Sequence, residues 1–388
     1  MSETPADAKV QTSRTSQDNL VSNIVNRPGA PIGSARAGRA KSRPADRIFK
    51  GLSTGAASLI MVILAGVAIF LIVKSIPAIT ANWATNPELS TGVTQGHNSF
   101  WGYVAPLIWG TVFVSAIGLI IGAPIAIGIA LFISHYSPRR IAGVLSYIVD
   151  LLAAVPSIVF GLWGIFVIRP FLIPLTHWLN QYLGWIPFFG GQASATGSTL
   201  LAGAVVLAVM VIPIITAISR EIFLQTPRLH EEAALAMGAT KWEMIRLAVF
   251  PYARSGMISA ILLGLGRALG ETMAIALIVS PSLIFSLKIL TDGQNSQTVA
   301  ANAALNFPDA NDLQRDALIG TGLMLFVISF AVNLVARIIV ARTGPDAKSR
   351  KTKRRVAQLP PSDPSSVLLV DAEAGPLHAH SIEGSQRA

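Results

Sequence analysis

The sequence contains no cysteine, and its histidines are few and scattered. None of the 388 residues is cysteine, so the chain can form no disulfide, no thiolate metal site and no cysteine nucleophile. Of the six histidines only His378 and His380 stand close together, near the C-terminus. No group of residues has the spacing of a metal site. The sequence therefore predicts that this chain binds neither a metal nor another cofactor.

Charged residues are also few, and they are unevenly distributed. Asp, Glu, Lys and Arg make up 13% of the chain, against about 25% in a typical soluble domain. We count 26 of them in residues 1–50 and 342–388, and only 24 in the 291 residues between. A middle region this apolar excludes an ordinary soluble enzyme. The net charge of +10 lies mostly in the two ends and in short loops, so it does not form the folded basic surface that nucleic-acid binding needs.

Long apolar runs, in contrast, are abundant. A helix needs about 20 mostly apolar residues to cross about 30 Å of hydrocarbon. Six segments meet this requirement, and we predict membrane helices over residues 52–73, 105–134, 141–168, 199–219, 255–284 and 317–341. The expected fold class is all-α, a polytopic bundle of six transmembrane helices. The third segment contains Asp150 and Pro156, so we expect it to be bent, tilted or partly re-entrant.

The flanking charges predict the orientation of the bundle. Cytoplasmic loops carry an excess of Lys and Arg. Near the spans, 20 such residues lie on the side of the N-terminus and 4 on the other side. We therefore expect both termini in the cytoplasm. Residues 1–50 and 342–388, rich in small and polar residues, are predicted to be disordered tails around a membrane domain at 51–341. The basic run 348–355 in the second tail suits anionic lipid.

The longest predicted cytoplasmic connection, residues 220–252, carries the signals of two short helices. Thr226-Pro227 is a favourable helix start, and Gly238 is placed to end that helix. A second, partly amphipathic helix is expected from about Thr240 to Pro251. Two interpretations remain: the pair lies on the lipid surface, or it docks onto a soluble partner. Gly238 favours the second, because it predicts a defined turn.

Two opposite charges stand inside the predicted fifth span. Arg267 and Glu271 are four residues apart, which predicts that they share one helix face within reach of each other. A charge at mid-bilayer costs about 2.5–3.5 kcal/mol on insertion scales and usually faces the bundle interior or a wet path. One interpretation is a structural ion pair between packed helices. In the other, Arg267 presents a planar donor fork to an oxyanion in transit, while Glu271 holds the fork and prevents overly tight binding.

Two polar residues of the third segment are further candidates for this path. Asp150 lies near the inner end of the segment. It either caps a helix or bridges to a neighbouring basic residue, or it compensates the charge of Arg267 across the bundle. Ser157 follows Pro156, which would bend the helix and free a carbonyl beside the Ser157 hydroxyl.

Part of the 220–252 connection resembles the EAA loop of ABC importer permeases. The resemblance rests on Glu232-Ala233-Ala234, on Gly238 and, nine residues further on, on Ala248-x-Phe250-Pro251. Ile and Leu are usual in that family at the positions of Ala248 and Phe250, and both replacements stay apolar. In that family the loop forms coupling helices that sit in a groove of the ATPase subunit. The resemblance implies that the coupling residues are Glu232, Ala233, Ala234, Gly238, Ala239, Thr240, Phe250 and Pro251.

The membrane segments narrow the resemblance. The stretch Gly264–Ala274 looks like the signature of the PstC permease family of phosphate ABC importers, and Ala154–Gly164 and Val332–Arg337 are also similar to it. The sister PstA family tends to differ where this chain has Thr272-Met273-Ala274. The resemblance covers about residues 52–341 and implies a type I, MetI-like permease fold. It also implies that Arg267 and Glu271 are important for transport, and we expect Thr272 to belong to the same translocation path.

The resemblance further implies an assembly in a bacterial inner membrane. A PstA-like permease would complete the translocation path, a PstB-like ATPase dimer would hydrolyse ATP on the inner side, and a PstS-like binding protein would deliver inorganic phosphate from outside. The sequence has no G-x-x-x-x-G-K-[ST] phosphate loop, so ATP is expected to bind another chain. We expect partners that include membrane lipids but no nucleic acid, and no enzyme activity of this chain.

Three alternatives stay open at this point. The first is an ABC permease for another oxyanion such as sulfate, because Arg267 cannot distinguish it from phosphate. The second is a secondary transporter or channel that works alone, against which the 220–252 loop argues. The third is an intramembrane enzyme, which no Ser/His, paired Asp or metal constellation supports.

Overall fold

The computed structural model describes residues 44–90, 92–94 and 96–343. Residues 1–43 and 344–388, which make up most of the predicted tails 1–50 and 342–388, lie outside this range. All regular structure in the described part is helical. Six helices are long and apolar enough to cross a membrane, Ile48–Thr80, Phe100–Tyr136, Ser157–Leu183, Leu200–Leu224, Lys241–Leu269 and Asp312–Ile339. The all-α class and the six candidate spans are thereby confirmed, while the orientation of the termini stays a prediction.

The chain divides into two compact units, residues 1–67 and 68–388. The described part of the first unit is the beginning of helix α2 (Pro44–Thr80), which starts seven residues before the predicted membrane domain at residue 51. Side chains such as Ile60 and Val62 are large, apolar and exposed. A helix that is apolar on all sides is suited to lipid or to a protein interior rather than to water.

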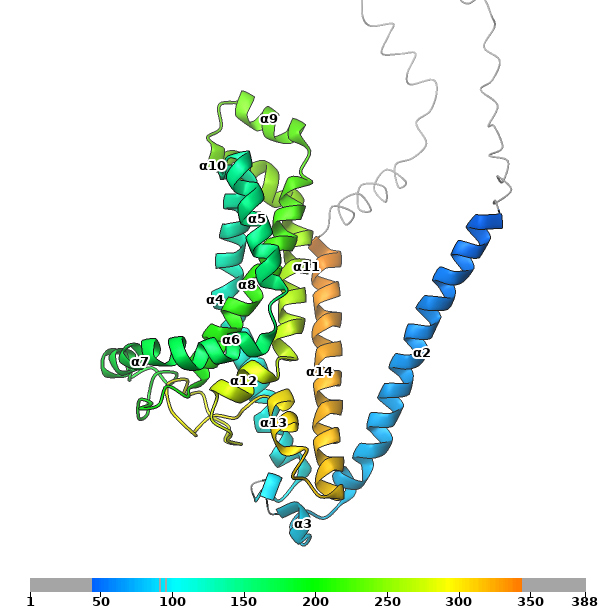
Figure 1. The fold of residues 1–388 in the computed structure, drawn as a ribbon, viewed down its shortest axis with the longest axis vertical. Coiled ribbons are helices and arrows are strands. Elements are labelled where there is room, and N and C mark those ends of the chain that lie inside the picture. Colours follow the sequence, from blue (N-terminus) through cyan, green and yellow to red (C-terminus); the bar gives the residue numbers. More distant parts are fainter. Residues whose placement is uncertain (1–43, 91, 95, 344–388) are drawn as a thin grey trace, which may run out of the picture. The chain divides into compact units, whose positions relative to one another are not determined.

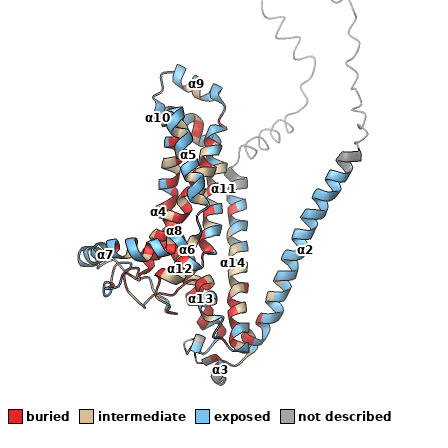
Figure 2. Cartoon of the chain, in the orientation of Figure 1, coloured by how far each residue is buried: buried red, intermediate tan, exposed pale blue. Residues whose placement is uncertain are grey.

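The centre of the second unit is formed by α4 (Phe100–Leu131) and α8 (Leu200–Leu224), which pack along each other. Buried residues gather along these two helices (Figure 2). Small residues allow the close approach. A Cβ atom at Gly118 would lie 3.1 Å from the Ala204 carbonyl oxygen, and one at Gly122 would lie 3.1 Å from that of Ala208. Helices α11 (Phe250–Leu269) and α14 (Asp312–Thr343) pack against this pair and against each other.

The predicted third span, 141–168, is wrong as a single helix. Helix α5 (Arg139–Ala153) ends before Pro156, and a new helix starts at Ser157 as α6 (Ser157–Trp163), π-helix η3 (Gly164–Ile168) and α7 (Arg169–Leu183). Proline disfavours helical backbone in the residue before it and has no N–H to donate, so the helix breaks. Figure 1 shows α7 running across the direction of α4, α8 and α14.

The predicted fifth span, 255–284, is also wrong at both ends. The candidate span begins earlier, with α10 (Lys241–Met244) and π-helix η4 (Ile245–Val249), and it ends with α11 at Leu269. Pro251 therefore does not end the helix. The Phe250 N–H bonds to the Ile245 carbonyl in the wider π register, and Pro251 then stands in the first turn of α11, where its missing N–H is tolerated.

Short elements connect these helices. One end of the unit holds α3 (Pro87–Ser90) and 3₁₀-helix η1 (Gly92–Thr94). Toward this end the chain also forms α12 (Met273–Ile278) and α13 (Val299–Asn306), with irregular backbone between them. At the opposite end lie π-helix η2 (Phe132–Tyr136), which continues α4, and α9 (Arg228–Ala236) (Figure 1). The two predicted functional regions, around Arg267 and in 220–252, therefore belong to different levels of the bundle.

Candidate translocation and coupling sites

Arg267 lies in the last turn of α11 on an uncovered face of that helix. Its side chain is exposed, as is that of Leu263 one turn earlier, and a Cβ atom at Gly266 would meet nothing within 4 Å. Within the described part of the chain, Arg267 makes no ion pair or hydrogen bond. Its guanidinium therefore keeps its donors available for an anionic ligand.

Glu271 does not pair with Arg267, and the expected ion pair on one helix face is wrong. Helix α11 ends at Leu269 with Gly270 as its cap, so Glu271 falls beyond the helix. Its side chain is 6% exposed, and its Oε1 accepts a hydrogen bond of 3.1 Å from the Ala274 N–H in the first turn of α12. The physical reason is local: glycine interrupts a helix easily, and a carboxylate is favoured at the positive end of the next one.

The other three predicted path residues are placed differently from one another. Thr272 is the residue before α12 and is half-buried. Ser157 begins α6, which packs against α12, so it belongs to the same group of elements. Asp150 is exposed on α5, outside the six candidate spans, and the expectation that it lies within a span is wrong. No described hydrogen bond or ion pair joins Asp150 to Arg267.

Helix α12 is held at its other end by Arg169, which was not among the predicted site residues. Its Nη2 donates to the carbonyl oxygens of Leu277, at 2.8 Å, and of Ile278. A cation at a helix C-terminus is favoured by the helix dipole. Glycines allow the close packing beside it, because a Cβ atom at Gly161 would lie 3.0 Å from the Cα atom of Ala274. The segment after Arg267 is thus fixed at both ends, by Glu271 and by Arg169.

The 220–252 segment has the expected helix–turn–helix form. Helix α9 ends just before Gly238, whose φ of +84° is the left-handed conformation that glycine adopts most readily. Helix α10 begins with a capping box: the Thr240 hydroxyl accepts from the Glu243 N–H at 3.3 Å, and the Glu243 carboxylate accepts from the Thr240 N–H at 2.8 Å. One detail was wrong, because Pro227 rather than Thr226 is the capping position of α9.

The predicted coupling residues divide into an outer and an inner set. Glu232, Ala233, Gly238, Thr240 and Pro251 are exposed, whereas Ala234, Ala239 and Phe250 are half-buried. The half-buried set joins the loop to the bundle, since Ala234 and Phe250 pack against a buried apolar cluster. This cluster is formed by Ala130, Leu131, Phe223, Met244, Ile245, Val249 and Ala253. On the outer side the large apolar side chains of Leu229 and Met237 are 76% and 88% exposed.

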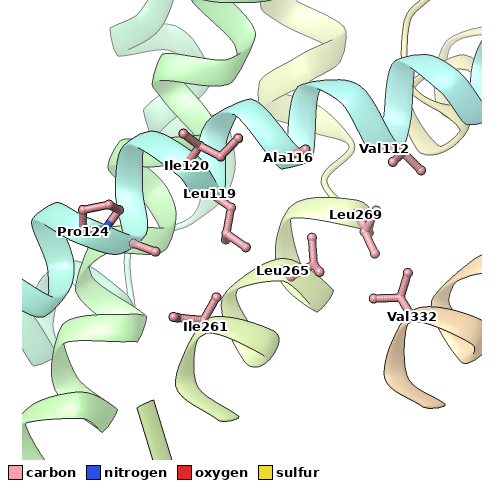
Figure 3. Close-up of a pocket in the computed structure, with 10 residues that line it drawn as sticks. Val112, Ala116, Leu119, Ile120, Pro124, Ile261, Leu265, Leu269 and Val332 are labelled. Carbon is pink, nitrogen blue, oxygen red and sulfur yellow. The ribbon is translucent and has the colours of Figure 1, made fainter. Parts of the chain in front are cut away.

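A pocket of about 550 Å³ opens between α4, α11 and α14. Its wall is apolar throughout, as the labelled side chains show (Figure 3), and consists of Val112, Ala116, Leu119, Ile120, Ala123, Pro124, Ile261, Leu265, Leu269 and Val332. An oxyanion needs N–H or O–H donors to replace its hydration. This pocket offers none from its side chains, so it is not the anion site.

Comparisons with known proteins agree with this arrangement. The family model described as "Binding-protein-dependent transport system inner membrane component" matches residues 122–347. The chain is 43% identical over 301 residues to the phosphate transport system permease protein PstC 2 of Mycobacterium tuberculosis, covering 77% of this chain and 92% of the relative. It is 41% identical over 308 residues to PstC of Mycobacterium leprae, covering 79% and 96%.

A solved structure supports the fold. A chain in the crystal structure of a bacterial alginate ABC transporter, in complex with an alginate pentasaccharide-bound periplasmic protein, aligns with a TM-score of 0.52 and 15% identity and covers 77% of this chain and 95% of that one. At that identity the likeness concerns the fold alone. The matched span 122–347 contains both the coupling segment and Arg267. The chain belongs to the family of binding-protein-dependent transport system inner membrane components, as a multi-pass permease subunit of the ABC importer class related to PstC.

Proposed function

We propose that this chain is the PstC-like permease subunit of an ATP-driven importer of inorganic phosphate. The observation that carries the proposal is the unpaired Arg267 on an uncovered face of α11, in a chain related to permeases named for phosphate transport. A guanidinium presents several N–H donors in one plane, which matches two oxygens of a phosphate. Glu271, four residues further on, has a different role in this proposal: its carboxylate fixes the start of α12 beside the path.

A second, PstA-like permease completes this path in the proposal. The exposed face of α11 around Arg267 is apolar apart from the arginine, as Leu263 at 56% exposure shows. An uncovered intramembrane charge is costly in lipid, so a protein surface opposite Arg267 is expected, with phosphate passing between the two permeases. Thr272 and Ser157 supply hydroxyl groups on the elements next to it.

The proposed importer works by coupling through residues 220–252. A PstB-like ATPase dimer hydrolyses ATP, binds the exposed side of α9 and α10, and moves these helices when it closes. A PstS-like binding protein delivers phosphate at the opposite end. This assignment puts both termini and the coupling loop in the cytoplasm of a bacterial cell, in agreement with the excess of Lys and Arg on that side. The chain itself binds no ATP in this scheme.

The central test replaces Arg267 in the assembled transporter. Arg267→Ala removes the donor fork, so phosphate uptake is expected to fall by about 100-fold or more, the loss of roughly 3 kcal/mol that follows removal of a charged hydrogen-bond donor. Arg267→Lys, which keeps the charge without the fork, should retain partial uptake. Co-purification of the ATPase and second permease checks that the complex forms. Normal uptake by Arg267→Ala would refute the proposed role.

The substrate is tested in the same cells. In a strain that lacks other phosphate importers, excess unlabelled phosphate should block uptake of labelled phosphate, whereas excess sulfate should not. Equal competition by sulfate would favour the alternative of a general oxyanion permease. Uptake driven by an ion gradient after reconstitution of this chain alone would favour the stand-alone transporter instead.

A further inference from the structure

The cytoplasmic loop is tied to the end of one particular helix, α4. The Glu231 carboxylate on α9 lies 3.5 Å from Nε2 of His135, and these side chains are 22% and 8% exposed. Ten residues further on, the Lys241 ammonium on α10 lies 4.9 Å from the centre of the Tyr136 ring. Consecutive residues of the π-helix η2 therefore hold both arms of the turn at Gly238.

The His135 ring is itself fixed in place. Its Nδ1 lies 2.7 Å from the Ser134 hydroxyl, and the ring meets the buried Phe223 edge-on at 6.4 Å. The Ser134 hydroxyl also lies 3.3 Å from the Leu131 carbonyl oxygen, so it links the ring to the preceding turn, while Nε2 faces the Glu231 carboxylate. A ring supported on two sides transmits a displacement of its partner better than a freely rotating one. The π-helical geometry places His135 and Tyr136 at this junction, and such segments are frequent at functional sites.

Helix α4 reaches from this junction to the opposite end of the unit. It has 32 residues before η2, a length of about 48 Å at 1.5 Å per residue. At its far end three side chains bind the segment 286–302. The Trp109 indole donates to the Ser286 carbonyl at 2.9 Å, the Thr111 hydroxyl accepts from the Val299 N–H at 2.9 Å, and the Tyr103 hydroxyl accepts from the Asn302 amide at 2.6 Å.

We propose that His135 and Tyr136 clamp the coupling loop to α4, and that α4 carries a displacement of this loop to the segment 286–302 at the other end. His135 is then a positioning residue for transport, acting through Glu231, and Tyr136 acts through Lys241. The inference rests on the proposed docking of an ATPase at 220–252 and adds the route by which that docking reaches the outer side. A continuous helix with specific contacts at both ends satisfies the need for a continuous physical link.

The test measures phosphate uptake per ATP hydrolysed by the complete transporter in proteoliposomes, with its binding protein present. Glu231→Gln and His135→Phe each remove the charged contact, and His135→Phe keeps a ring against Phe223. Each is expected to lower the uptake-to-hydrolysis ratio about threefold to tenfold, the size of typical coupling effects, while the ATPase still co-purifies. The exchange variant His135→Glu with Glu231→His should recover most of the ratio. If the two residues only stabilised the fold, exchanging them would not restore the uptake-to-hydrolysis ratio.

Matched controls use the same residue types outside the clamp. Glu88 on α3 and His177 on α7 are exposed, so Glu88→Gln and His177→Phe should leave the ratio unchanged. Normal coupling in both single clamp variants, or no recovery in the exchange variant, would overturn the clamp. The proposed function is tested separately by Gly238→Pro. If Gly238→Pro uncouples the transporter and the clamp variants do not, only the clamp proposal is refuted. If Gly238→Pro also couples normally, the proposed docking of the ATPase at this loop is refuted too.

Discussion

Arg267 and Glu271 are close in sequence but have different surroundings. The arginine is exposed on α11, whereas the glutamate is buried and accepts a hydrogen bond from the first turn of α12. The sequence correctly singled out both residues as unusual charges in an apolar chain. It could not place them, because the four-residue spacing has its usual meaning only if the helix continues, and Gly270 ends it.

Loss of the Glu271 cap should lower the stability of the transporter. Glu271→Ala removes the acceptor of the Ala274 N–H, and capping residues contribute about 0.5–2 kcal/mol. The midpoint of thermal unfolding of the purified complex should fall by a few degrees. Glu271→Gln keeps an acceptor, so its midpoint should fall less. Glu221→Ala, at an exposed position of α8, serves as the control. An unchanged midpoint in Glu271→Ala would contradict the capping role.

The clamp residue His135 shows the limit of sequence reasoning at this scale. Neither His135, a lone histidine at the end of a span, nor Glu231 stands in a sequence pattern that indicates a partner. Their contact joins positions that are 96 residues apart. No local pattern predicts such a contact, because it depends on the packing of α9 against η2.

At the scale of elements, apolar composition predicted how many spans to expect but not where their backbone breaks. Hydropathy is blind to backbone continuity, so 141–168 and 255–284 were each assigned to one helix. Pro156 signalled the first break in advance. Gly270 gave no comparable warning, since glycine is common inside membrane helices. The coupling segment was predicted well because its turn depends on local signals, namely Gly238 and the Thr240–Glu243 capping box.

The contact of α4 with the segment 286–302 depends on a missing side chain. A Cβ atom at Gly110 would collide with the Ser296 carbonyl oxygen and would lie 2.6 Å from that of Gln297. Gly110→Ala should therefore displace this segment and cost about 1–3 kcal/mol, as overpacking does. Gly128→Ala on the same helix meets nothing within 4 Å and should be neutral or slightly stabilising. Thermal unfolding of the two variants side by side measures the difference, and equal midpoints would contradict the close packing.

At the scale of the whole molecule, the two candidate regions lie at different levels, and α11 joins them, since it starts at Phe250 and carries Arg267 in its last turn. Coupling helices that project from one end require that the whole bundle respond as a unit when they move. The turn at Gly238 determines whether the two arms can be held at once, because its left-handed backbone sets the angle between α9 and α10.

Replacing Gly238 should separate transport from ATP hydrolysis. Proline is confined to φ near −65°, so Gly238→Pro cannot keep the turn and is expected to reduce phosphate uptake at least about tenfold while the chain still inserts. Asparagine tolerates positive φ, and Gly238→Asn should keep most of the uptake. ATPase activity and uptake are measured on the same preparations. Equal uptake by both variants would argue against a defined turn.

The interruption between α11 and α12 has a consequence for the surrounding bilayer. Residues 270–272 are not helical where the candidate span ends: the Glu271 N–H donates to the Ala268 carbonyl and the Thr272 hydroxyl donates to the Gly270 carbonyl, so the main-chain groups here lack the continuous ladder of a helix. Hydrocarbon cannot satisfy such groups, and each one exposed to it costs several kcal/mol. We therefore expect hydrated space or another polypeptide, rather than acyl chains, against this part of the chain.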